Sequence, residues 1–290
     1  MKKHKVLFVV SLFLGLTCLA SMSFAQPFDF SPSRYIVVHE AIWAPATGGG
    51  TWTTEWQITD HSGGSVVQVW VYLWGESWRG PFTIWTSPGI FQSYKSSNLL
   101  SRIQSIDPVN NDYYGKVGAV QFATQDADHV IQVNVRTYNG NYSKTFNGTP
   151  QEMLGNKAEG DREMFIMNMP NNSTYRATVG MVNLSGASIT VEFILVDYQN
   201  GTLGTAFSKT IPAWTFEAIF PYTEAGAPSY SNCWIYINPT GGTGELYPFG
   251  ATSNNYTNDP AAHVAIPFDY LAPAAAQPPS DSPAVPDKKN

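Results

Sequence analysis

The sequence predicts an all-β fold made of two antiparallel, Ig-like β-sandwich modules in series. Three features of the chain support this prediction. Many segments between residues 35 and 270 alternate apolar and polar side chains with a period of two, as half-buried strands do. Clusters of Gly, Asn, Asp and Ser separate these segments at short intervals. A strand–turn–strand pattern also occurs twice, which indicates a repeated module.

Residues 1–25 have the features of a secretory signal peptide. Three lysines among the first five residues precede the apolar run Val6–Ala20, and small residues occupy both positions that a signal peptidase reads. The run is too short to span a bilayer. We therefore expect cleavage after Ala25 and a mature protein that is secreted or periplasmic. Lipidation at Cys18 is the alternative, although Thr17 precedes this cysteine where a smaller residue is usual.

The mature chain is acidic and retains one cysteine. Cleavage removes three lysines and no acid, so 13 basic and 22 acidic side chains remain and the net charge falls from −6 to −9. An acidic surface disfavours nucleic acid and anionic membranes as partners, and we expect no stable membrane insertion. Cys233 has no second cysteine to pair with, so we interpret it as a buried structural thiol.

The first module is expected over residues 27–156. Its clearest strand is Thr51–Ile58, in which every second side chain is large or β-branched and points to one face. A turn of Asp, His, Ser and Gly follows at residues 60–65, where most residues tolerate positive φ or bond their own backbone. The next strand is Val66–Trp74, which is rich in β-branched and aromatic residues.

The second module, residues 160–272, repeats this pattern. Tyr175–Phe193 aligns without gaps with Trp52–Trp70, and the alignment places Asn183 opposite Asp60 at the start of two turns of equal length. The alternative is a chance similarity between two β-hairpins. If the repeat is real, each module has its own core and should fold alone.

Three segments lie outside the strand pattern. Residues 155–162 are short, polar and charged, and mark the boundary between the modules. Residues 273–290 are rich in Pro and Ala and are expected to form a disordered tail. A short helix is expected over Asn98–Ile106, capped by Ser96 or Ser97.

The second copy carries a recognisable set of short motifs. A strand begins at Tyr175 and leads into an Asn-x-Ser turn at Asn183, an apolar alternating strand follows, and Tyr-Thr-Asn-Asp-Pro occurs at residues 256–260. This set resembles a tandem β-sandwich module of secreted bacterial proteins of unassigned function, and the resemblance covers residues 35–270. The resemblance implies a fold and an exported location, and it implies no chemistry.

The strand Val66–Trp74 is apolar on both faces. Trp70, Tyr72 and Trp74 share one face, and valines with Leu73 form the other. The repeat alignment places Trp70 opposite Phe193, which predicts that the aromatic face is the core face. A slip of one residue would reverse the assignment. Coverage of the strand on both sides, or use of one face for binding, is the remaining alternative.

Seven of the nine tryptophans lie between Trp43 and Trp85, which suggests a platform for a sugar or another flat apolar ligand. Trp78 is the strongest ligand-binding candidate, because it lies in a polar hairpin loop where folding gives no reason for an indole. Trp85 and Trp43 are expected to lie beside it.

The sequence contains no recognisable catalytic motif, and we assign no catalytic residue and no cofactor. Asp126, Asp128 and His129 are weak candidates for a divalent cation site, and a polar turn between strands explains them equally well. Glycosidase chemistry needs only two carboxylates at a set spacing. Glu55, Asp60 and Glu76 are available for that role, although acids on strands and turns are ordinary.

These features predict an exported, non-enzymatic protein that acts by surface binding or assembly, with a glycan or a protein surface as partner. Carbohydrate binding through the first module is the specific form of this hypothesis. The alternatives are a carbohydrate-active hydrolase and a structural subunit of a cell-surface or extracellular assembly that pairs through open strand edges. The sequence does not define the oligomeric state.

Overall fold

The structure is a computed structural model that describes residues 32–46, 49–140, 142–150, 155–156, 163–197, 199, 201–231, 233–256 and 260–267. The predicted signal peptide, its cleavage site and the predicted tail lie outside the described residues. The named strands pair antiparallel throughout and helices are few, so the predicted all-β class is confirmed. Within the described ranges, no helix is both long and apolar enough to cross a membrane.

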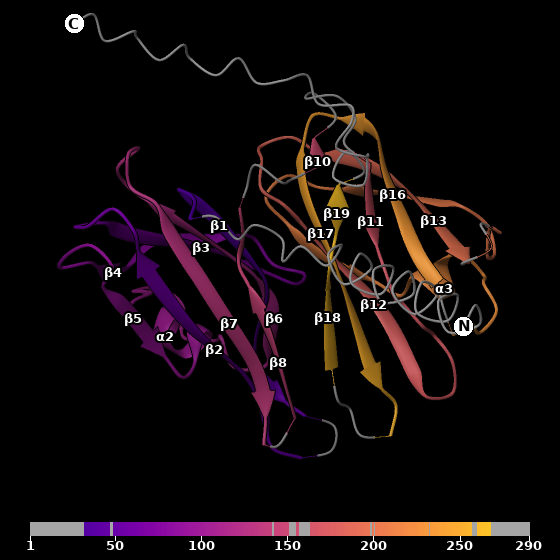
Figure 1. Ribbon diagram of the computed structural model, residues 1–290, viewed down its shortest axis with the longest axis horizontal. Helices are drawn as coiled ribbons and strands as arrows, with labels where there is room; N and C mark the ends of the chain where they lie inside the picture. Colours follow the sequence, from indigo (N-terminus) through magenta and orange to yellow (C-terminus); the bar gives the residue numbers. More distant parts are fainter. Residues whose placement is uncertain are drawn as a thin grey trace, which may run out of the picture.

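The first half of the chain forms one sheet of nine strands, here called sheet A, which occupies the left side of Figure 1. Its strands are β1 (Tyr35–Pro45), β2 (Thr51–Asp60), β3 (Val66–Leu73), β4 (Arg79–Thr86), β5 (Ser93–Ser96), β6 (Lys116–Thr124), β7 (Ile131–Asn139), β8 (Tyr142–Asn147) and β9 (Thr149–Pro150). They run in the order β4-β3-β6-β1-β2-β7-β8, with β5 paired to β2 and β9 to β1.

The second half forms two five-stranded sheets that face each other on the right of Figure 1. Sheet B has the order β10-β17-β12-β15 with β18 on β17, and sheet C has the order β14-β13-β16-β11-β19. The strands are β10 (Gly155–Asn156), β11 (Met164–Ile166), β12 (Tyr175–Asn183), β13 (Ile189–Asp197), β14 (Phe207–Ile211), β15 (Phe216–Ile219), β16 (Cys233–Gly242), β17 (Glu245–Asn254), β18 (Pro260–Val264) and β19 (Ile266–Pro267).

The two halves use the same strand order. The run β4-β3-β6-β1 with β9 corresponds to β14-β13-β16-β11 with β19, and the run β2-β7-β8 with β5 corresponds to β12-β17-β18 with β15. The sheet count differs because β1 is long, bulges between Val38 and Ala41, and pairs with both β6 and β2. Its counterpart β11 has three residues and pairs with β16 and β19, so sheets B and C remain separate.

The turns between the first matched strands are built by one side chain each. The Asp60 carboxylate accepts hydrogen bonds from the backbone of Ser62, Gly63 and Ser65 and from the Ser65 hydroxyl, at 2.8–3.1 Å. Burial opposes ionisation of Asp60, but these hydrogen bonds outweigh it and lower its pKa to about 2. Asn183 takes the same place in the second copy. Its side chain accepts from the Ser185 N–H and donates to the Ala187 carbonyl.

Two short helices lie between matched strands, α2 (Leu99–Gln104) before β6 and α3 (Pro221–Glu224) before β16. The predicted helix after residue 98 is therefore present. The predicted cap, Ser96 or Ser97, is wrong. Asn98 is the N-cap, because its side-chain oxygen accepts the Ser101 N–H at 3.0 Å.

Three groups of buried apolar side chains hold the described residues together. One lies inside the first half, around Trp56, Phe122 and the valines of β3. The second lies between sheets B and C, and it contains the free thiol of Cys233, which confirms the expected buried thiol. Burial raises the pKa of this thiol. The third group, here called the interface core, joins sheet A to sheet B and consists of Val37, Tyr72, Ala119, Val182, Leu184, Phe216, Tyr247 and Phe249.

The interface core explains why β3 is apolar on both faces. Val67, Val69, Val71 and Leu73 are fully buried in the first-half core, whereas Tyr72 is buried in the interface core with Trp70 packed against it. The prediction that the aromatic face is the first-half core face is wrong. The inward-facing residue that corresponds to Ile189 is Val67 and not Val66. The alignment of the two copies therefore shifts by one residue after the turn that holds Gly63 and Gly64. Both glycines have a positive φ.

Candidate functional site

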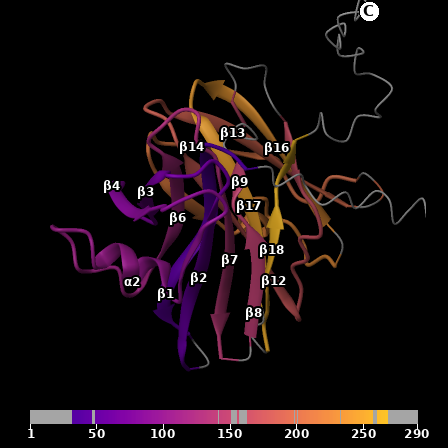
Figure 2. The same ribbon diagram turned by 60° about the vertical axis from the view of Figure 1, so that its left-hand side comes forward.

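The line along which the two halves meet, here called the seam, gathers four tryptophans. Trp52 and Trp74 come from the first half at one cavity, and Trp78 and Trp214 meet from opposite halves at a neighbouring groove. Trp74, Trp78 and Trp214 are 49%, 41% and 37% exposed. Large apolar rings are usually buried, so exposed indoles gathered at one place indicate a binding surface. In Figure 2 the first half comes forward, in front of sheets B and C.

The outer groove is lined by residues 75–78 and 213–217. The Trp78 and Trp214 ring centres lie 6.3 Å apart with a 50° angle between the ring planes. Thr215, Glu76 and Glu217 add a hydroxyl and two carboxylates to the walls. The groove therefore combines two apolar ring faces with hydrogen-bonding oxygen atoms.

Trp214 is held in an unusual backbone conformation. Its φ of 56° lies in the left-handed region, which is rare for a bulky residue and costs about 1–3 kcal/mol. The turn is held by the Trp214 N–H, which donates to the Ser185 carbonyl at 3.1 Å, and by the Asn183 N–H, which donates to the Thr215 carbonyl at 2.9 Å. The indole of Trp214 lies over Gly186, where a Cβ would be 3.4 Å from the indole nitrogen, at ordinary contact distance.

Glu76 is fixed by two cations. Arg79 donates to one carboxylate oxygen at 2.5 Å, and Lys116 is ion-paired with the other. Arg79 also contacts Asp112 at 2.8 Å. This network fixes the loop that carries Trp78, so its indole is presented by a structured hairpin.

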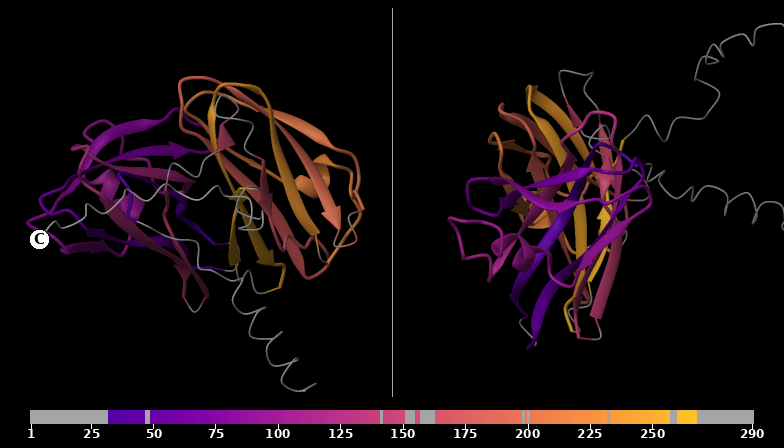
Figure 3. Two further views of the ribbon diagram at one scale, coloured as in Figure 1. Left: turned by 45° about the horizontal axis from the view of Figure 1, so that its top comes forward. Right: turned by 90° about the vertical axis from the view of Figure 1, so that its left-hand side faces the viewer.

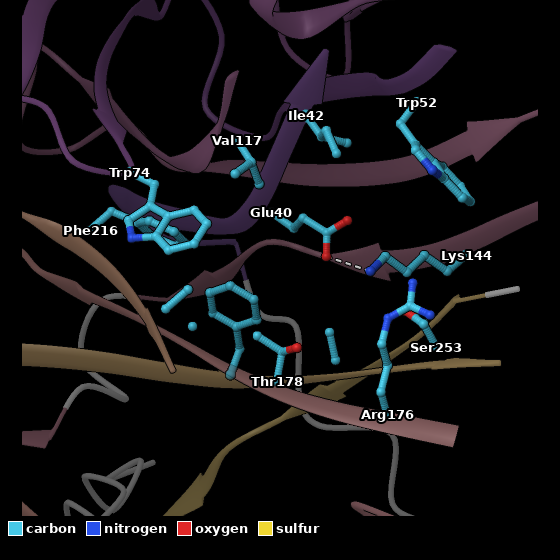
Figure 4. Close-up of a pocket in the computed structure, with 14 residues that line it drawn as sticks. Glu40, Ile42, Trp52, Trp74, Val117, Lys144, Arg176, Thr178, Phe216 and Ser253 are labelled. Carbon is cyan, nitrogen blue, oxygen red and sulfur yellow. Dashed lines mark hydrogen bonds and ion pairs between the residues drawn. The ribbon is translucent and has the colours of Figure 1, made fainter. Parts of the chain in front are cut away.

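The second hollow, here called the inner cavity, has a volume of about 250 Å³ and lies between sheets A and B (Figure 4). Trp52, Trp74 and Phe216 form much of its apolar wall. Glu40 and Lys144 form an ion pair at its edge, and both side chains are largely buried. The Arg176 guanidinium extends toward Lys144 in Figure 4, and it also donates to the Asn255 side chain at 3.3 Å.

His39 lies behind the Glu40–Lys144 pair, fully buried among Phe146, Tyr247 and Phe249. Neither ring nitrogen has a hydrogen-bond partner among the described residues. Burial and, second, the Lys144 charge lower the pKa of His39 to about 3. The imidazole is therefore neutral at pH 7, and Lys144 supplies the positive charge at this end of the cavity.

The three predicted ligand-binding tryptophans lie at separate places in the structure. Trp78 lies in the outer groove, exposed as its loop position suggested. Trp85 packs against the first-half core and stacks on Tyr94, with ring centres 6.1 Å apart. Trp43 also packs against that core and meets Tyr114 edge-to-face at 5.3 Å. The partner that the groove gives Trp78 is Trp214.

The weak metal candidates form one contact. The Asp126 carboxylate lies 3.6 Å from the His129 ring, and Asp128 is exposed. Across the described part of the chain, no group of three or more His, Cys, Asp or Glu side chains is arranged to hold a metal ion.

Sequence reasoning missed Trp214 and the charged residues of the inner cavity, and it named Trp74 only as part of the aromatic face of the strand Val66–Trp74. Like Trp78, Trp214 is an indole in the turn between two strands, and the same rule could have found it. Glu40, Lys144 and Arg176 lie far apart in the chain and carried no local signal. Sheet A brings Glu40 and Lys144 together, and the packing of sheet B on sheet A adds Arg176.

No protein-family model matches the chain, and no curated protein matches it. Among solved structures, a lectin from Pleurotus ostreatus in complex with GalNAc aligns with 81% of this chain and 82% of its own, at 12% sequence identity and a TM-score of 0.14. At that TM-score the alignment carries no argument about fold or ligand.

Proposed function

We propose that this protein is an exported, non-enzymatic binding protein that takes a carbohydrate across the indoles of Trp78 and Trp214 in the outer groove. The exposed indole pair is the observation that carries the proposal. Pyranose rings offer apolar faces that pack on indoles and hydroxyls that need polar partners. The groove offers both types of group, since Thr215, Glu76 and Glu217 lie beside the rings.

The strained backbone at Trp214 supports the same proposal. A bulky residue at positive φ is retained where the surrounding structure holds it, and such residues cluster at ligand sites. An exposed indole at this position adds nothing to the folding of the turn, whereas it offers a ligand a ring to stack on.

The roles of the acids favour binding over hydrolysis. Asp60 organises its turn through four hydrogen bonds, and Glu76 is neutralised by Arg79 and Lys116. A general acid needs a raised pKa, and the pKa of Asp60 is lowered. The proposed export rests on the signal-like residues 1–25, and the proposed tandem module of secreted bacterial proteins rests on the repeated motifs.

The test begins with a glycan array on the mature protein and continues by calorimetric titration of the best glycan. We expect Trp78→Ala and Trp214→Ala each to weaken binding by about 1–3 kcal/mol, because each removes one stacking ring. Thermal melts should change little, since both indoles are exposed.

Phe91→Ala is the matched control. Phe91 is 67% exposed and lies in the turn before β5. This turn lies near the start of β3, whereas the Trp78 loop follows the end of β3. This variant should bind like the wild type. Failure of every glycan to bind would contradict the carbohydrate proposal and leave assembly as the better function. Loss of folding in Trp78→Ala would show that the indole is a packing residue.

A further inference from the structure

We propose that the inner cavity is a second binding site, for a small neutral compound with one or two fused rings and a hydroxyl group. This site is distinct from the outer groove. Trp74 and Phe216, which form an isolated backbone bridge, stand between the two hollows, and Phe216 lines both.

Small side chains on sheet B leave the hollow. Gly180, Ala218 and Ala251 lie on three neighbouring strands and line the cavity. A Cβ on Gly180 would lie 2.1 Å from the ring of Phe249, so glycine allows that ring to lie across β12. Because these three positions carry at most a methyl group, sheet B does not fill the space opposite sheet A.

The walls of the cavity suit a flat apolar body. Figure 4 shows Trp74 and Trp52 on opposite sides of the cavity, with Ile42 between them. Phe216 and Phe249 supply further rings from sheet B. The volume of about 250 Å³ lies just below the range of about 300–1,000 Å³ typical of small-molecule sites. One or two fused rings fit such a space, and a long lipid chain does not.

The charged groups at the cavity are already engaged by other protein groups, which favours a neutral ligand. Glu40 and Lys144 form an ion pair, and their side chains are only 13% and 6% exposed. The Arg176 guanidinium donates to the Asn255 side chain. The imidazole of His39 behind the ion pair is neutral and adds no charge. A charged ligand would therefore lose its water in the cavity without gaining a counter-charge of its own.

One hydroxyl on the wall suits a ligand that carries a single polar group. Thr178 lines the cavity, and its side chain makes no hydrogen bond among the described residues. In Figure 4 it lies on the sheet B side of the cavity, between Phe216 and Arg176. A threonine hydroxyl both donates and accepts, so it can pair with a ligand hydroxyl in either direction. The geometry therefore places the fused rings between Trp52 and Trp74 and the ligand hydroxyl at Thr178.

The test uses three probes of one shape and different charge at pH 7: 2-naphthol, 2-naphthoate and 2-naphthylmethylammonium. By calorimetric titration into the intact protein, we expect 2-naphthol to bind about tenfold or more tightly than either charged probe, because only the neutral probe enters without an unpaired charge. Absence of 2-naphthol binding at millimolar concentration would overturn the proposal, and so would equal affinity for the three probes.

Two substitutions test whether the probe lies in the cavity. Ala251→Phe should abolish 2-naphthol binding, because the added ring fills the hollow. Thr178→Val should weaken binding about two- to tenfold, because it removes one hydrogen bond and keeps the shape of the side chain. Ala261→Phe is the matched control. Ala261 is exposed and pairs with Thr252, so its side chain lies on the opposite face of sheet B from Ala251, and this variant should bind 2-naphthol like the wild type.

Variants of the outer groove separate this proposal from the proposed function. Trp78→Ala and Trp214→Ala should leave the affinity for 2-naphthol unchanged, and Ala251→Phe should leave glycan binding unchanged, so the two sites fail or succeed separately. Loss of 2-naphthol binding in Trp78→Ala would show that the probe occupies the outer groove and would overturn the proposal. Unchanged affinity in Ala251→Phe or in Thr178→Val would overturn it too, and the second test holds even if Ala251→Phe does not fold.

Discussion

At the scale of single residues, His39 shows what the packing of two sheets imposes on a side chain. Its ring lies 4.2 Å from Phe146 and 4.8 Å from Phe249, centre to centre, and it makes no hydrogen bond among the described residues. The groups that face it with charge or a titratable proton are Lys144 with its partner Glu40, and Tyr247. Protonation would place a second positive charge beside Lys144 without solvent.

This arrangement predicts a loss of stability in mild acid. The unfolded chain takes up a proton on His39 below pH about 6.5, whereas the folded state does so only near pH 3. Unfolding is therefore favoured as the pH falls through this window, by up to about 1.4 kcal/mol per pH unit, or roughly 2 kcal/mol at pH 5. Urea melts at pH 7 and pH 5 measure the effect.

His39→Met is the control variant, because it keeps an adaptable apolar side chain in the same space and removes the titrating group. It should lose less stability than the wild type between pH 7 and pH 5. Burial and the Lys144 charge also lower the pKa of His263. This histidine is present in both proteins, so its contribution cancels in the comparison. Equal pH dependence in the two proteins would show that His39 is not the group responsible.

At the scale of one element, β3 is a strand covered on both sides. Leu73 is buried on the face toward the first-half core, and Tyr72 is buried on the face toward the second half, where its hydroxyl donates to the Gln121 side chain at 3.1 Å. We expect Leu73→Ala to cost about 2–5 kcal/mol of unfolding free energy and Tyr72→Ala about 3–5 kcal/mol. Chemical denaturation of both variants measures this, and a silent variant would show that its face of β3 is open.

The same strand shows how far sequence reasoning reaches. Period-two alternation predicted the buried face of β2, because one face of that strand is buried and the other is not. Turn chemistry predicted the matched turns at Asp60 and Asn183 for local reasons. The faces of β3 were assigned wrongly because both are apolar, and only the position of the second half tells them apart. The inner cavity was not predictable, since it arises from contact between strands distant in the chain.

At the scale of the whole molecule, the interface core couples the halves. Tyr72 and Val37 of sheet A pack against Phe216, Tyr247 and other residues of the second half, and all of them are at most 4% exposed. Figure 3 shows the two halves in contact from two further directions. A half expressed alone would expose this apolar face to water.

We therefore expect residues 27–150 and 155–272, divided so that β10 stays with sheet B, to give β-type circular dichroism when expressed separately but to melt at lower temperature than the intact protein. Each half should also bind a hydrophobic dye that the intact protein does not bind, because the interface core is exposed. Identical melting temperatures for the separate and joined halves would contradict a stabilising interface.

The outer groove lies on the seam and needs one indole from each half. The most direct test is a double-mutant cycle, by calorimetric titration of the array-selected glycan into the wild type, Trp78→Ala, Trp214→Ala and the double variant. If both rings contact the same sugar, each single substitution weakens binding. The loss of binding free energy in the double variant is then smaller than the sum of the two single losses, by about 0.5 kcal/mol or more. If Trp214→Ala binds like the wild type, the ligand does not lie between the two halves and the proposed site is wrong.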